Sequence, residues 1–121
     1  WSVERRNEIA KRYDEALKHL PLLTPYRTEN MWHAFHLYVI EVHPSKRKAL
    51  YDYLRENKIY SQVLYIPAHT MPYYKDLGWK DGDMPVAEDY YTRCLALPMY
   101  PSLSDEEQQY VIDTIINFYA Q

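Results

Sequence analysis

SQVLYIPAHTMPYY, residues 61–74, combines an apolar run with a histidine, two prolines and several phenols. The apolar run is typical of a buried strand, which we expect over residues 59–66. Proline fixes φ and lacks an N–H donor, so the strand must end at Pro67. The chain therefore turns at a strand end and presents His69 beside tyrosines, in the kind of loop where functional residues concentrate.

Two helices and one strand are predicted before this stretch. Apolar residues at helical spacing indicate a helix over residues 2–20, which Pro21 ends. Residues 32–42 are rich in aromatic and β-branched residues and indicate a strand buried on much of both faces. Ser45 is expected to cap a helix over residues 46–57.

After this stretch the pattern predicts a loop, two helices and one short strand. Residues 67–84 are expected to be mostly loop. Pro85 suits the first position of a helix, and residues 95–97 are a short apolar strand candidate. Ser104 and Glu107 have the spacing of a capping box, which predicts the start of the last helix.

Together these elements predict the α+β class. We expect a small, mainly antiparallel sheet of about three strands with helices packed on one face. The strands would be residues 32–42, 59–66 and 95–97. A sheet this small leaves its other face exposed unless another domain covers it.

Composition excludes several classes of protein. The chain has 121 residues, enough for one domain, and 47% of them are hydrophobic. A net charge of −3 argues against a nucleic-acid-binding surface. No segment has the roughly 18 apolar residues of a membrane helix, so we expect no membrane contact. The single cysteine, Cys94, fits a reducing, cytoplasmic compartment and is expected to be buried.

His69 is the best candidate for a functional side chain, because histidine donates or accepts hydrogen bonds near neutral pH. The alternative is a loop histidine bonded to the backbone. His33 and His36 would point to opposite faces of the predicted strand, so we predict no metal site from them. The chain has no glycine-rich phosphate loop. Taken alone, these residues do not name a reaction.

A set of motifs occurs in an order and at a spacing that resembles one enzyme family. The motifs are RRNEIAKRY (residues 5–13), WH (32–33), LRENKI (54–59), YIPAH (65–69), PVAE (85–88) and LPMYPSLS (97–104). The resemblance is to the C-terminal domain of the DegT/DnrJ/EryC1/StrS aminotransferases, over nearly the whole chain. Within that family it is greatest to enzymes that aminate C4 of a UDP-4-keto-6-deoxy-N-acetylhexosamine in pseudaminic acid biosynthesis.

The resemblance implies that residues 1–121 are the small domain of a two-domain, homodimeric enzyme with the aspartate-aminotransferase fold. That enzyme would use pyridoxal phosphate to move an amino group from L-glutamate to the ketone of a UDP-sugar. A large N-terminal domain would supply the lysine that binds the cofactor. We therefore expect no catalytic or cofactor-binding residue in this chain, and no pyridoxal phosphate on it alone. The helix over residues 1–20 has no capping residue before it and would continue from the large domain.

By the same resemblance, Tyr65, His69 and Tyr73 would contact the sugar nucleotide. Trp32 and His33 also match the family pattern and are expected to be structural or interface residues. One alternative remains open, a stand-alone α+β binding or oligomerisation module without catalysis. It draws on the 14 tyrosines and on the lack of catalytic motifs, and it predicts a protein that needs no other domain.

Overall fold

Three short antiparallel strands form the centre of the computed structural model, which describes residues 1–121. The central strand is β2, and Tyr38 at its start lies opposite Leu97 at the end of β3. The predicted α+β class with a small antiparallel sheet is confirmed. In sheet order, the strands are β1 (Leu22–Leu23), β2 (Tyr38–Val42) and β3 (Cys94–Leu97).

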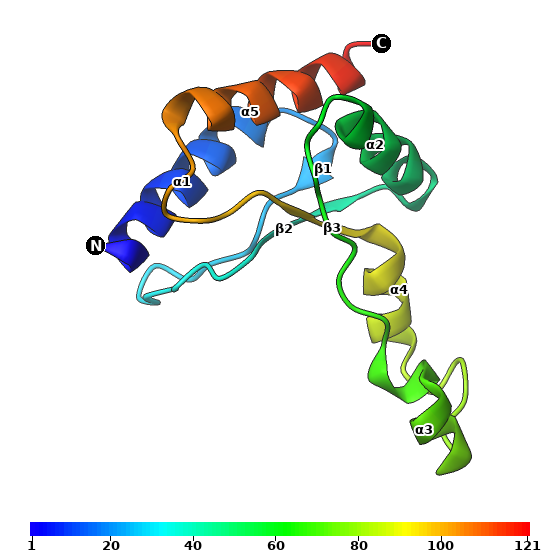
Figure 1. Cartoon of the computed structure of the whole chain (residues 1–121). Coiled ribbons are helices and arrows are strands. Elements are labelled where there is room, and N and C mark those ends of the chain that lie inside the picture. The colour runs from blue at the N-terminus through cyan, green and yellow to red at the C-terminus, as the bar shows by residue number, and fades with distance from the viewer.

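Three of the five α-helices gather on one side of the sheet. Figure 1 shows α1, α2 and α5 together there, while α4 and α3 extend away from the rest of the molecule. We call this extension, residues 65–93, the arm. None of the helices has the length and apolar character required to cross a membrane. The helices are α1 (Ser2–Leu17), α2 (Pro44–Glu56), α3 (Pro72–Asp76), α4 (Pro85–Arg93) and α5 (Asp105–Tyr119), with a short 3-10 turn η1 (Ala68–Thr70).

The hydrophobic core lies between the sheet and the three gathered helices. Two tyrosines are fully buried in it and each finds a partner for its hydroxyl. Tyr13 donates to the Pro98 carbonyl at 2.9 Å, and Tyr38 donates to the Asp14 carboxylate at 2.6 Å. Burial raises the pKa of both phenols, so both remain protonated donors. The other large buried side chains are Ile9, Leu17, Phe35, Ile40, Leu50, Leu54, Leu95, Gln108, Ile112 and Ile115.

Three helix starts follow from local sequence signals. The capping box of α5 is confirmed, since Ser104 accepts from the Glu107 N–H and the Glu107 carboxylate accepts from the Ser104 N–H. Pro85 occupies the first turn of α4, as predicted. The predicted start of α2 is wrong, because its cap is His43, whose Nδ1 accepts from Ser45. Proline then opens the helix at position 44, where its missing N–H costs nothing.

The predicted boundaries of the first helix and first long strand are also too wide. Helix α1 ends at Leu17 rather than at residue 20, and a turn leads into Pro21. The strand expected over residues 32–42 begins only at Tyr38. Phe35 has φ of +46°, a left-handed conformation that interrupts an extended strand.

The strand predicted over residues 59–66 is wrong. Only Gln62 pairs with the sheet, through two backbone hydrogen bonds to Ala96 of 3.1 and 2.8 Å. The third strand of the sheet is instead β1, which pairs with β2 on the opposite edge. Residues 63–66 consequently leave the sheet and lead into the arm.

Candidate functional site

Two arginines attach the base of the arm to the rest of the protein. Arg93, at the end of α4, forms an ion pair with Glu41 on β2. Arg47 in α2 donates to the Tyr91 carbonyl at 2.7 Å and lies over its ring. Helix α4 is thereby fixed against both the sheet and α2, and it carries the outer part of the arm.

A single carboxylate holds the outer part of the arm together. His69 lies in η1 with only 7% of its surface exposed, and its Nε2 is 2.9 Å from Oε1 of Glu88 in α4. The same Oε1 accepts the Gly82 N–H at 2.7 Å. Gly82 has φ of +93°, a conformation that favours glycine over any other residue. Glu88 therefore links α4 to η1 and to the turn that contains Gly82.

The contacts of Glu88 decide its charge. The Gly82 N–H, and secondly His69, hold the pKa of the Glu88 carboxyl below its usual range. Glu88 is therefore ionised at neutral pH and can only accept hydrogen bonds. It follows that Nε2 of His69 is the donor in this pair. A buried histidine bonded to a carboxylate differs from the backbone-bonded loop histidine that the sequence left open.

The structure buries His69 but exposes the two tyrosines expected to act with it. Tyr65 is 70% exposed at the start of the arm, and Tyr73 is 69% exposed in α3. Helix α3 packs against η1, so Tyr73 and His69 lie on neighbouring elements. The Tyr73 ring also meets the Tyr74 ring edge-on, with centroids 5.2 Å apart. Both expected tyrosines are available to a ligand or to another polypeptide.

The arm exposes an unusual amount of apolar surface. Large apolar side chains are normally scattered singly on a protein surface, and a cluster of them marks an interaction site. Here they follow one another along the whole arm. The exposed apolar and aromatic residues are Tyr65, Ile66, Met71, Tyr73, Tyr74, Leu77, Trp79, Met84, Val86 and Tyr90.

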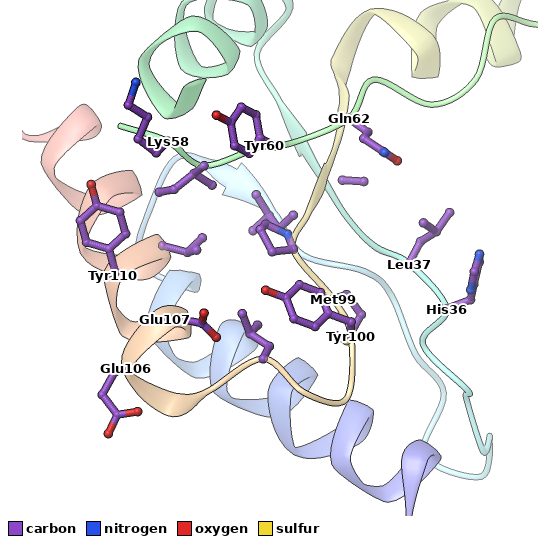
Figure 2. A pocket seen from close by; sticks show the side chains of 16 residues that line it. His36, Leu37, Lys58, Tyr60, Gln62, Met99, Tyr100, Glu106, Glu107 and Tyr110 are labelled. Atoms are coloured by element: carbon purple, nitrogen blue, oxygen red, sulfur yellow. The ribbon is translucent and has the colours of Figure 1, made fainter. Parts of the chain in front are cut away.

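An apolar pocket lies elsewhere. Figure 2 shows it between the segment that carries Lys58 and Tyr60, the turn after β3, and the first turns of α5. It has a volume of about 640 Å³ and mostly apolar walls, with Tyr100 and Tyr110 among its lining side chains. None of the three residues expected to bind substrate lines this pocket. Glu107, one of its charged lining residues, is already engaged in capping α5.

The residues of this chain do not by themselves fit pyridoxal phosphate. The cofactor needs a lysine in an enclosed site, but every lysine here is exposed. Lys48, Lys75 and Lys80 are paired with surface aspartates. Lys58 is the lysine that lines the apolar pocket, where the other lining residues are mostly hydrophobic and two of them are glutamates, which disfavour a phosphate group.

Other residues singled out in the sequence have structural roles. The Nδ1 of His33 accepts the Phe35 N–H at 2.9 Å, and its ring packs on Phe35, which stabilises the left-handed turn. Trp32 is exposed beside it. The prediction that Cys94 is buried is confirmed. Sequence reasoning missed Glu88 as part of the site, because its partner His69 lies 19 positions away.

Comparisons with known proteins point to one family. The family model described as "DegT/DnrJ/EryC1/StrS aminotransferase family" matches residues 1–116. The chain is 42% identical over 119 residues to the spore coat polysaccharide biosynthesis protein SpsC of Bacillus subtilis, covering 93% of this chain and 31% of that protein. It is 34% identical to the dTDP-4-dehydro-2,3,6-trideoxy-D-glucose 4-aminotransferase of Saccharopolyspora spinosa, covering 92% of this chain and 28% of that enzyme.

A solved structure gives the same picture. A DegT DnrJ EryC1 StrS aminotransferase from Brucella abortus superimposes with a TM-score of 0.88 and 33% identity. The match covers 99% of this chain and 32% of that one. The chain thus spans about a third of the length of the proteins it matches.

Proposed function

Since this chain belongs to the DegT/DnrJ/EryC1/StrS aminotransferase family, we propose that it is the C-terminal small domain of a sugar-nucleotide aminotransferase. The full-length enzyme transfers an amino group from L-glutamate to C4 of a UDP-linked 4-keto-6-deoxy sugar, in pseudaminic acid biosynthesis. It is a cytoplasmic homodimer, and pyridoxal phosphate supplies the electron sink for the transfer. A large N-terminal domain, outside residues 1–121, provides the lysine for this cofactor.

The family match over residues 1–116 carries this proposal. The exposed arm supports it, because many exposed apolar side chains on one segment suit a fragment that packs against another domain or subunit. A stand-alone binding or oligomerisation module is the weaker candidate, because residues 1–116 match a family of aminotransferases. The C4 position agrees with the name of the Saccharopolyspora spinosa relative, whereas the UDP group rests on the sequence resemblance alone.

Within the proposed enzyme, the arm closes the sugar side of the active site. His69, Tyr65 and Tyr73 contact the sugar nucleotide, the two phenols through both ring and hydroxyl. These residues bind and orient the ketone, while the apolar side chains around them exclude water from the reaction. No residue of this chain exchanges a proton with the cofactor in this account.

Half-reactions of the full-length protein test the proposal. L-Glutamate should change the absorbance of bound pyridoxal phosphate, and a UDP-4-keto sugar should restore it. His69→Ala should slow the return step with the sugar much more than the first step with glutamate. Lys46→Ala, a change at an exposed lysine in α2, is the matched control and should alter neither step. Equal loss of both steps in His69→Ala would remove the arm from the sugar side.

A further inference from the structure

The side chain of His69 has two nitrogens in different surroundings. Nε2 is hydrogen-bonded to Glu88, at 2.9 Å. Nδ1 has no hydrogen-bond partner in the protein and keeps some contact with solvent, although His69 as a whole is only 7% exposed. One nitrogen is therefore engaged within the protein, and the other is free to bond to a ligand.

The identity of the partner on Nε2 fixes the position of the proton. Glu88 is an ionised acceptor that already receives the Gly82 N–H, so the imidazole must donate through Nε2. A neutral imidazole carries one proton, and with that proton on Nε2 the lone pair lies on Nδ1. The exposed atom of His69 is then a hydrogen-bond acceptor.

We infer that Glu88 is a positioning residue, which holds the proton of His69 on Nε2 and presents Nδ1 as the acceptor for a hydroxyl of the sugar substrate. This inference rests on the proposed function and adds the residue that orients His69 and the polarity of the contact. The chemistry favours a hydroxyl-bearing ligand, because a bare imidazole nitrogen repels carboxylate and phosphate oxygens and bonds to an O–H donor. Carboxylate partners of this kind commonly fix the tautomer and orientation of a functional histidine.

The geometry around Glu88 explains how this one residue can position the imidazole of His69. Glu88 lies in the first turn of α4, where the helix dipole favours a negative charge. Helix α4 is itself fixed to β2 through the Arg93–Glu41 pair. Because α4 is anchored to the sheet, Glu88 holds the imidazole in a fixed position, and this gives Nδ1 a defined direction.

Three variants of the full-length protein separate positioning from a purely structural role. Glu88→Ala removes the acceptor and should lower kcat/KM for the sugar half-reaction by about 10- to 100-fold. Glu88→Gln keeps an amide oxygen for both hydrogen bonds and should recover most of this loss. His69→Gln keeps an N–H donor toward Glu88 but has no Nδ1, so it should fold normally and lose as much sugar turnover as Glu88→Ala.

Asp89→Ala is the matched control, because Asp89 is an acidic neighbour on the same helix that pairs with Arg93 and not with His69. It should leave both half-reactions unchanged. The glutamate half-reaction should be unchanged in all of these variants. A His69→Gln enzyme with normal sugar turnover would show that the imidazole serves only to hold the arm, and would overturn the inference.

The tautomer can be read directly. In full-length protein labelled with nitrogen-15 histidine, His69→Gln identifies the His69 signals by their loss. In the neutral imidazole of wild-type His69 the proton should lie on Nε2, and Glu88→Ala should lose this preference. A proton on Nδ1 in the wild type overturns the inference.

Activity separates this inference from the proposed function. If the wild type is active in both half-reactions and Glu88→Ala is equally active, this inference alone is overturned. If the wild type is active in neither half-reaction, the proposed function is overturned, and the role of Nδ1 falls with it.

Discussion

Arg5 in α1 donates to Asp105 at the start of α5 across 2.9 Å, although the two residues are 100 positions apart. The same guanidinium donates to the Leu103 carbonyl at 2.8 Å. Asp105 also forms an ion pair with Arg12, whose guanidinium nitrogen lies 3.6 Å from its carboxylate. The first and last helices are thus joined by charged hydrogen bonds at the N-terminus of α5, where an acidic residue is also favoured by the helix dipole.

This junction predicts how stability depends on pH. The hydrogen bond from Arg5 is the main reason that the pKa of Asp105 lies below its usual range. A carboxyl with a lowered folded-state pKa contributes stability above its unfolded-state pKa of about 4, and loses it as pH falls through the folded-state value. Asp105→Asn should lower Tm at neutral pH, and this difference from wild type should vanish in strong acid.

Thermal denaturation at a series of pH values measures this effect. Asp76→Asn is the control, because Asp76 is an exposed residue at the end of α3 that forms no ion pair in the structure. It should leave the pH profile unchanged. An Asp105→Asn deficit that persists in strong acid would contradict this account, because the loss would then not depend on the charge of Asp105.

Leu50 tests the packing of the core. It is fully buried on α2, and removing its branched side chain leaves a cavity between the helix and the sheet. Leu50→Ala should lower the free energy of unfolding by about 3 kcal/mol. Val86→Ala is the control, since Val86 is 83% exposed on the arm and its truncation should change little. Urea denaturation measures both, and a Leu50→Ala loss no larger than that of Val86→Ala would contradict the described core.

Tyr38 tests a buried hydrogen bond. Its hydroxyl donates to Asp14, and Asp14 also pairs with Arg27. Tyr38→Phe should cost about 1 kcal/mol of stability, because it deletes the bond and leaves the aspartate with one fewer donor. Tyr26→Phe, at a tyrosine that is 89% exposed, should have no effect. Equal stability of the two variants in urea would mean that the bond contributes nothing.

Much of the fold could be predicted from short-range sequence signals. The capping box at Ser104 and the proline at position 85 located two helix starts, because both act through residues within one helical turn. The strands were harder to predict than the helix starts. β1 is only two residues long, Leu22–Leu23, and lies between prolines 21 and 25, so no periodic pattern marks it.

The strand predicted over residues 59–66 was wrong because tertiary contacts, rather than local sequence, decide the path of this segment. The segment has strand composition, but β propensity reflects packing against neighbours more than backbone preference. Only Gln62 forms a backbone bridge to β3. The Leu64 carbonyl accepts from the Cys94 thiol of β3 instead, and the exposed side chains of Tyr65 and Ile66 begin the arm. The Glu88–His69 pair could not be predicted for a similar reason. Its two members are ordinary residues in separate helices, and only the path of the arm brings them together.

Transfer of isotopically labelled nitrogen tests the central claim most directly. Full-length protein would be incubated with pyridoxal phosphate, a UDP-4-keto-6-deoxy sugar and L-glutamate labelled with nitrogen-15 on its amino group. Labelled ammonium in place of labelled glutamate serves as the control, and mass spectrometry follows the sugar nucleotide. The account predicts a UDP-4-amino sugar that carries the label from glutamate and none from ammonium. An unchanged ketone, from a protein that has bound the cofactor, would contradict it.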